Sequence, residues 1–335
     1  MGVDRESIPS VVERVRPISA GAPVVGIHFL KETAVFVLGE EALLLAARDG
    51  EPERVAVHGG AILSSASDGG RVVTGGDDGK VVSTDVKGNN ETVATDAKRR
   101  WIDHVAVGPS NAVAWSAGKQ AFAHTGKGAE KSIEVVSTVG GLAFAPKGLR
   151  LAIAHYNGAS LWFPNAKAEP DTLEWKGSHL GARFSPDGRF LVTSMQEPML
   201  HGWRLDDRKD MRMSGYASRV RSLDWTADGK WLATSGSTQL ILWPFQSKDG
   251  PMGKTPQLLA PTEHHVEAVT CHPKQAVVAA GYADGLILLV RIDDGAEVLA
   301  RKPGDAPVSA LAWSADGRLL AFGTEDGTAG MIDLG

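Results

Sequence analysis

Histidine is the residue type in this chain with the widest chemical scope, because it binds metals and transfers protons near neutral pH. Ten histidines are present among 335 residues, together with a single cysteine. Neither a His-Glu-x-x-His motif nor a pair of Cys-x-x-Cys motifs occurs, so the spacing does not support a zinc site. We interpret the histidines as strand and loop residues with ordinary hydrogen bonds.

A catalytic or metal-binding centre has few candidates. His28, Asp103, His104 and Asp224 could meet only if the strands that bear them face one common channel. No Gly-x-Ser-x-Gly motif marks a nucleophilic serine. Cys271 takes a position that phenylalanine or tryptophan takes in related segments, which indicates a core residue rather than a reactive thiol. The sequence therefore predicts no catalytic residue, no metal site and no cofactor. An enzyme or metal-binding protein that uses the four channel residues remains the alternative.

A short motif recurs along the chain and defines the elements that position these residues. Its copies begin at Phe144 (Phe-Ala-Pro-Lys-Gly), Phe184 (Phe-Ser-Pro-Asp-Gly), Trp225 (Trp-Thr-Ala-Asp-Gly) and Trp313 (Trp-Ser-Ala-Asp-Gly). The first three aromatic residues lie about 40 residues apart, and the last step covers about two such periods. Apolar alternation flanks each copy, which is typical of two half-buried strands joined by a turn.

Each period contains four short strand patterns, which predicts an all-β, closed β-propeller of four-stranded antiparallel blades with almost no helix. We favour eight blades, with seven as the alternative. The predicted first strands lie near Ile27, Leu63, Val105, Ala143, Arg183, Leu223, Val269 and Leu311. The last unit has only three strands, so the segment 11–15 is expected to supply its outer strand and to close the ring. Residues 1–10 are predicted to be a flexible N-terminal segment, and residues 11–335 a single domain.

The repeats resemble those of the WD40 family over nearly the whole chain. Leu161-Trp162, Gly202-Trp203 and Leu242-Trp243 match the tryptophan that ends the family's third strand, and Gly281-Tyr-Ala-Asp-Gly285 matches its preceding turn. The family's buried Asp–His–Ser/Thr–Trp network is incomplete in every repeat. The resemblance implies a non-catalytic scaffold or adaptor for protein–protein interaction, as a subunit of a larger complex.

Charge and composition restrict the partners. The net charge is −5 and the pI is about 6.1, which disfavours nucleic-acid binding. No apolar run approaches 18 residues, so we expect no membrane insertion. Met1 to Ala20 lacks the apolar stretch of a secretory signal, and a single cysteine fits a reducing compartment. The expected location is cytoplasmic, with a monomeric propeller inside a hetero-complex.

The resemblance also implies a binding face, since connections from an outer strand to the next inner strand line the face on which this family binds partners. Aromatic and cationic residues concentrate in three of these connections and are of the types enriched at interface hot spots. The predicted partner-binding residues are Arg99, Arg100, Trp101, Tyr216, Arg219, Arg221, His264 and His265.

Overall fold

The computed structural model describes residues 8–126 and 130–335, which form two compact units. Unit 1 comprises residues 1–55 and 216–335, and unit 2 comprises residues 56–215. Of the segment predicted to be flexible, residues 1–7 lie outside the described part. Ser10 forms an isolated bridge with Leu299. The single-domain organisation of residues 11–335 stays a prediction.

The recurrent turn forms through its own side chains. In the copy at 185–188, the Ser185 hydroxyl donates to the Asp187 carboxylate over 2.6 Å and accepts the Phe190 amide over 3.0 Å. Gly188 adopts a φ of +75°, which favours glycine. Equivalent hydroxyl–carboxylate bonds join Thr226 to Asp228 and Ser314 to Asp316. The turn prediction is confirmed, and each turn sets the register of the first two strands of a blade.

Unit 1 contains four sheets of four antiparallel strands each. The first is β2 (Val24–Leu30), β3 (Thr33–Leu38), β4 (Ala42–Ala46) and β5 (Glu53–Ala56). The second is β20 (Leu223–Trp225), β21 (Trp231–Thr234), β22 (Leu240–Pro244) and β23 (Gln257–Leu259). The third is β24 (Val266–Cys271), β25 (Val277–Tyr282), β26 (Ile287–Arg291) and β27 (Glu297–Arg301). The fourth is β28 (Val308–Trp313), β29 (Leu319–Thr324), β30 (Thr328–Asp333) and β1 (Val15–Ser19).

Unit 2 contains two sheets of four strands and one of six. The four-stranded sheets are β6 (Ile62–Ser67), β7 (Arg71–Gly76), β8 (Lys80–Asp85) and β9 (Asn90–Thr95), and β10 (His104–Val107), β11 (Val113–Ala117), β12 (Gln120–His124) and β13 (Lys131–Glu134). The six-stranded sheet is β14 (Gly141–Phe144), β15 (Leu151–Trp162), β16 (Asp171–Phe184), β17 (Phe190–Met195), β18 (Met199–Arg204) and β19 (Asp210–Ser214).

These sheets are the blades of an all-β propeller, and the predicted fold class is confirmed. The helical turns of the described residues are η2 (Val12–Arg14) and η3 (Pro109–Asn111). The count of seven sheets agrees with the alternative of seven blades rather than with the favoured eight. The reason is β16, whose 14 residues pair with β15 through their first part and with β17 through their last part. The fourth and fifth sequence units therefore share one sheet.

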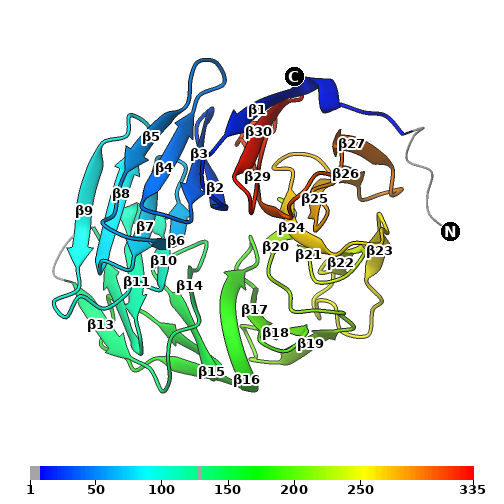
Figure 1. The fold of residues 1–335 in the computed structure, drawn as a ribbon. Coiled ribbons are helices and arrows are strands. Elements are labelled where there is room, and N and C mark those ends of the chain that lie inside the picture. The colour runs from blue at the N-terminus through cyan, green and yellow to red at the C-terminus, as the bar shows by residue number, and fades with distance from the viewer. Residues whose placement is uncertain (1–7, 127–129) are drawn as a thin grey trace. The chain divides into compact units, whose positions relative to one another are not determined.

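The outer strand of the last blade comes from the beginning of the described chain, as predicted. Strand β1 runs antiparallel to β30 with five register pairs, from Val15–Ile332 to Ser19–Thr328 (Figure 1). Its predicted bounds of 11–15 were wrong. Val11 instead donates its amide to the Leu299 carbonyl on β27, and residues 12–14 form the turn η2 that leads into β1.

The core of each unit lies between the faces of its blades. In unit 1, Ile18 of β1 packs with Phe36, Leu44 and Met331 in one buried cluster. In unit 2, Ala114 of β11 packs with Leu142 and Ile153 of the next blade. Because both faces of a blade are covered, a central strand such as β4 is buried at every position. The described part of the chain contains no helix with the length and hydropathy that a membrane span requires.

Candidate functional site

The connection between β9 and β10 carries Trp101, the one tryptophan among the predicted partner-binding residues. Trp101 is 62% exposed, and Arg99 beside it is exposed in the left-handed region with a φ of +51°. Asp96 fixes this connection, because its carboxylate accepts the amides of Lys98 and Arg100 over 3.0 Å each. The connection therefore holds an exposed indole ring on a fixed backbone.

Arg100 holds the connection to the next blade through its side chain. Its guanidinium pairs with Asp96 over 2.6 Å and donates to the Gln120 amide oxygen over 2.8 Å. Its side-chain hydrogen bond lowers the pKa of the buried Asp96 carboxyl below the usual value. The guanidinium also lies over the Phe122 ring, 6.0 Å from its centroid. Arg100 thus positions Trp101, while Arg99 and Trp101 remain accessible.

A second exposed apolar residue lies on the following connection of unit 2, residues 135–140. Val136 is 76% exposed. The amides of Val135 and Val139 donate to the carbonyls of Lys119 and Gly118, at the β11–β12 turn beside Arg100. The Ser137 hydroxyl accepts the Tyr156 amide over 2.8 Å, which joins this connection to β15. Hydrogen bonds therefore connect the segments that carry Trp101, Val136 and the half-exposed Tyr156.

Tyr216, one of the predicted partner-binding residues, is buried in the structure. Tyr216 of unit 1 is 7% exposed, and its hydroxyl is hydrogen bonded to the Thr234 hydroxyl over 2.9 Å. The Trp243 indole donates to the same phenol oxygen over 2.6 Å. Burial raises the pKa of Tyr216 above its usual value. The phenol therefore joins a hydroxyl and an indole in one buried network at this blade end.

The other predicted residues of unit 1 lie on two connections that contact each other. The Ser218 hydroxyl and Nδ1 of His265 are 3.3 Å apart, which joins the connection 215–222 to the connection 260–266. Arg219 and Arg221 are exposed on the first. His264 is exposed on the second, with Nε2 3.9 Å from the Asp284 carboxylate. Arg219, Arg221 and His264 are accessible, and His265 is half-buried.

A buried histidine that the sequence analysis did not single out caps the β6–β9 blade. His58 lies 3.0 Å from the Asp78 carboxylate through Nδ1 and 2.8 Å from the Thr74 hydroxyl through Nε2. Burial acts to raise the pKa of Asp78, but the Gly59 amide and the His58 ring outweigh it, so the pKa lies below its usual value. The sequence contains a pattern that could have identified His58. It precedes a threonine on the second strand of its blade, as Tyr216 does.

The four channel candidates divide between the two units. His28 and Asp224 belong to unit 1, whereas Asp103 and His104 belong to unit 2. The Asp224 carboxylate accepts the Cys271 amide over 2.7 Å and links two neighbouring inner strands. Burial raises the pKa of the Cys271 thiol, in keeping with a core residue. Across residues 8–126 and 130–335, no group of three or more His, Cys, Asp or Glu residues could hold a metal ion.

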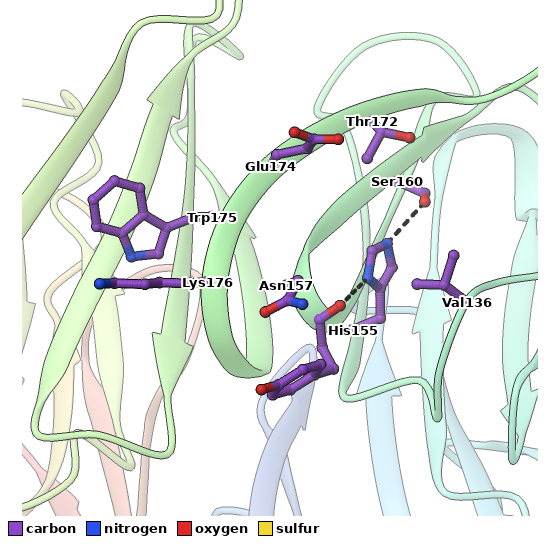
Figure 2. A pocket seen from close by; sticks show the side chains of 9 residues that line it. Val136, His155, Asn157, Ser160, Thr172, Glu174, Trp175 and Lys176 are labelled. Atoms are coloured by element: carbon purple, nitrogen blue, oxygen red, sulfur yellow. Dashed lines mark hydrogen bonds between the residues drawn. The ribbon is translucent and has the colours of Figure 1, made fainter.

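A pocket of about 480 Å³ lies in unit 2 where β15 meets β16 (Figure 2). Its lining includes Val136 and Tyr156, so it belongs to the same linked set of connections as Trp101. His155 and Ser160 come from β15, and Thr172 and Glu174 come from β16. The sequence analysis missed this pocket because its residues belong to no recognised motif.

Two family models match parts of this chain. Residues 269–335 match the WD40 domain of anaphase-promoting complex subunit 4, and residues 209–244 match the WD domain, G-beta repeat. The second match spans β19 to β22, and it contains the Tyr216, Thr234 and Trp243 network.

Individual relatives are distant. The serine-threonine kinase receptor-associated proteins of Mus musculus and Bos taurus are each 22% identical over 206 residues, which cover 51% of this chain and 59% of the relative. The chain thus aligns with less than two thirds of their length. The crystal structure of the computationally designed protein Ika8 has a TM-score of 0.77 at 16% identity, over 94% of this chain and 97% of Ika8. That likeness concerns the fold alone.

Proposed function

Because this chain is a β-propeller of the WD40-repeat family, we propose that it is a non-catalytic platform that binds partner proteins through the connections between its blades. Propellers of this kind generally act as scaffolds for protein interaction. The proposal includes a role as one subunit of a cytoplasmic hetero-complex. The mouse and bovine relatives are named as receptor-associated proteins, which is in keeping with such a role.

The observation that carries the proposal is the exposed Trp101 on a connection with a fixed backbone. A large aromatic side chain that is 62% exposed gains apolar burial when a partner covers it. Asp96 and Arg100 already order the connection through side-chain hydrogen bonds. Binding would therefore lose little conformational entropy, which favours affinity.

Affinity capture from the native cell tests the proposal with a pair of matched variants. Trp101→Ala removes the exposed indole of the proposed face. Phe163→Ala removes an aromatic side chain that is 43% exposed on the connection between β15 and β16, which carries none of the predicted partner-binding residues. Both variants should keep the wild-type melting temperature, because neither side chain belongs to a buried cluster.

The proposal expects that wild type and Phe163→Ala capture the same proteins and that Trp101→Ala loses at least one of them. If Trp101→Ala captures the full wild-type set, the proposed face is wrong. A separate variant, Arg219→Ala, tests whether the connections of unit 1 also bind a partner, because Arg219 is exposed there.

A further inference from the structure

The pocket at β15 and β16 has a hydrogen-bonded pair as its floor. His155 and Ser160 are 2% and 6% exposed, and Nε2 of His155 lies 2.9 Å from the Ser160 hydroxyl oxygen. Nδ1 of His155 lies 2.9 Å from the Tyr156 carbonyl oxygen. Figure 2 shows the ring held between these two partners, beside Val136.

The hydrogen-bond directions follow from the Tyr156 carbonyl, which can only accept. Nδ1 of His155 must therefore carry a proton, and in the neutral ring Nε2 is an acceptor. The Ser160 hydroxyl then donates its hydrogen to Nε2 and offers the pocket only its lone pairs. Ser160 can therefore bind a ligand group that donates a hydrogen bond.

The wall of the pocket adds a second acceptor, which is charged. Thr172 stands opposite Ser160 in the β15–β16 register, and Glu174 follows on the same face of β16, opposite Gly158. The β16 backbone packs closely on Gly158 at this position, where a β-carbon would lie 2.1 Å from the Leu173 carbonyl oxygen. Neither Glu174 nor Lys176 is ion-paired with any residue that the structure describes. In Figure 2 the Lys176 side chain extends away from His155 and Ser160.

The mouth of the pocket is apolar and aromatic. Val136 is 76% exposed and Tyr156 is 56% exposed, and both line the entrance side. The alkyl stem of a long basic side chain packs well on such residues, and a cation is attracted to the face of a tyrosine ring. An apolar entrance, a neutral acceptor and an unpaired carboxylate are together complementary to a long cationic side chain.

We propose that this pocket binds an arginine side chain from an extended segment of the partner protein. A guanidinium carries several donors in a planar fork, so it can bond Ser160 and Glu174 together, which an ammonium does less well. The inference rests on the proposed interaction function and names the partner chemistry at one position. The pocket would act as a specificity site beside the Trp101 connection.

A peptide titration tests the inference without knowledge of the partner. The probe is a blocked pentapeptide with a central arginine between glycines, and the comparison peptide carries the uncharged analogue citrulline. Binding is followed by NMR of the valine methyl groups, where Val136 reports on the pocket. The arginine peptide should shift the Val136 resonances saturably, and the citrulline peptide should bind at least about tenfold more weakly, as expected for the loss of a charged hydrogen bond.

Two protein variants locate the binding. Glu174→Gln should weaken the arginine peptide about tenfold, while Glu91→Gln, which neutralises an exposed carboxylate on β9, should bind it as wild type does. Equal affinity for the citrulline peptide, wild-type affinity in Glu174→Gln, or no shift at Val136 would each overturn the inference. Such a result leaves the capture experiment with Trp101→Ala unaffected, so the two proposals fail separately.

Discussion

Buried hydroxyl and imidazole groups at the blade ends determine much of the local order in this chain. Tyr216→Phe removes the acceptor for the Trp243 indole and a partner of the Thr234 hydroxyl, all in a buried setting. We expect the free energy of unfolding to fall by about 1–3 kcal/mol. Urea denaturation measures it, with Tyr156→Phe as the control because Tyr156 is 56% exposed. Equal stability of the two variants would contradict the capping role.

His201 on β18 predicts an acid-sensitive stability. It stacks on Trp175 with ring centroids 4.0 Å apart, and neither ring nitrogen has a hydrogen-bond partner in the described residues. Asp210 lies 3.8 Å away, beyond hydrogen-bond reach. Burial, followed by the charges of His179 and Arg212, lowers the pKa of His201 to about 3.

The sign of the pH effect follows from this lowered pKa. Below about pH 6.5, His201 is protonated in the unfolded chain but stays neutral in the folded protein. The free energy of unfolding therefore falls as the pH is lowered from about 6.5 to 3, by up to about 1.4 kcal/mol per pH unit. His201→Phe should retain the stacking and show a shallower decline in denaturation curves across that range. Parallel pH profiles for wild type and variant would refute the assignment.

At the same scale, sequence reasoning placed Trp101 and Tyr216 on connections but could not tell which of the two side chains is buried. Trp101 follows a basic cluster in a connection, and both features survive in the structure. Tyrosine suits an interface and a buried hydrogen bond equally well, so residue type alone could not decide. The deciding signal was the spacing to Thr234 and Trp243, 18 and 27 residues later, which matches a blade end.

Among the elements, β15 and β16 show how a tight turn determines a pocket. Asn157 and Gly158 adopt positive φ in the middle of β15, and a β-carbon on Gly158 would lie 2.1 Å from the Leu173 carbonyl oxygen. Gly158→Ala should therefore lower stability by about 3 kcal/mol or more. Gly148→Ala should cost only about 1–2 kcal/mol, since its φ is +75° but no atom lies within 4 Å. Thermal melts rank the two, and the reverse order would show that the close approach is not rigid.

The positions of the first strands could be predicted from the period, whereas the join between two units could not. Apolar alternation specifies the inner strands, because their side chains meet buried faces. It does not specify whether an outer strand stops before the next inner strand. Lys176, Gly177 and Ser178 carry no proline or turn pair that would end β16, so the strand continues from its pairs with β15 to its pairs with β17, with a register shift between Glu174 and Ser178. The pocket depends on this junction and was missed with it.

For the whole molecule, the contact between β1 and β30 makes a distant segment part of the last blade. Deleting residues 1–20 removes five register pairs and uncovers the cluster that contains Ile18. We expect a large fall in the melting temperature. Within the full chain, Ile18→Asp should be strongly destabilising, and Ser19→Asp, exposed on the same strand, should be nearly neutral. A deletion variant that melts like wild type would contradict the pairing.

Hydrogen–deuterium exchange on the protein with and without a captured partner tests the binding face most directly. We predict that the partner protects amides of residues 96–103 and 135–140, the connections that carry Trp101 and Val136. Residues 86–89 and 163–170, which join other strands of the same sheets, should exchange at their free rates. Protection of residues 86–89 and 163–170 alone, with exchange in the Trp101 connection unchanged, would contradict the proposed face.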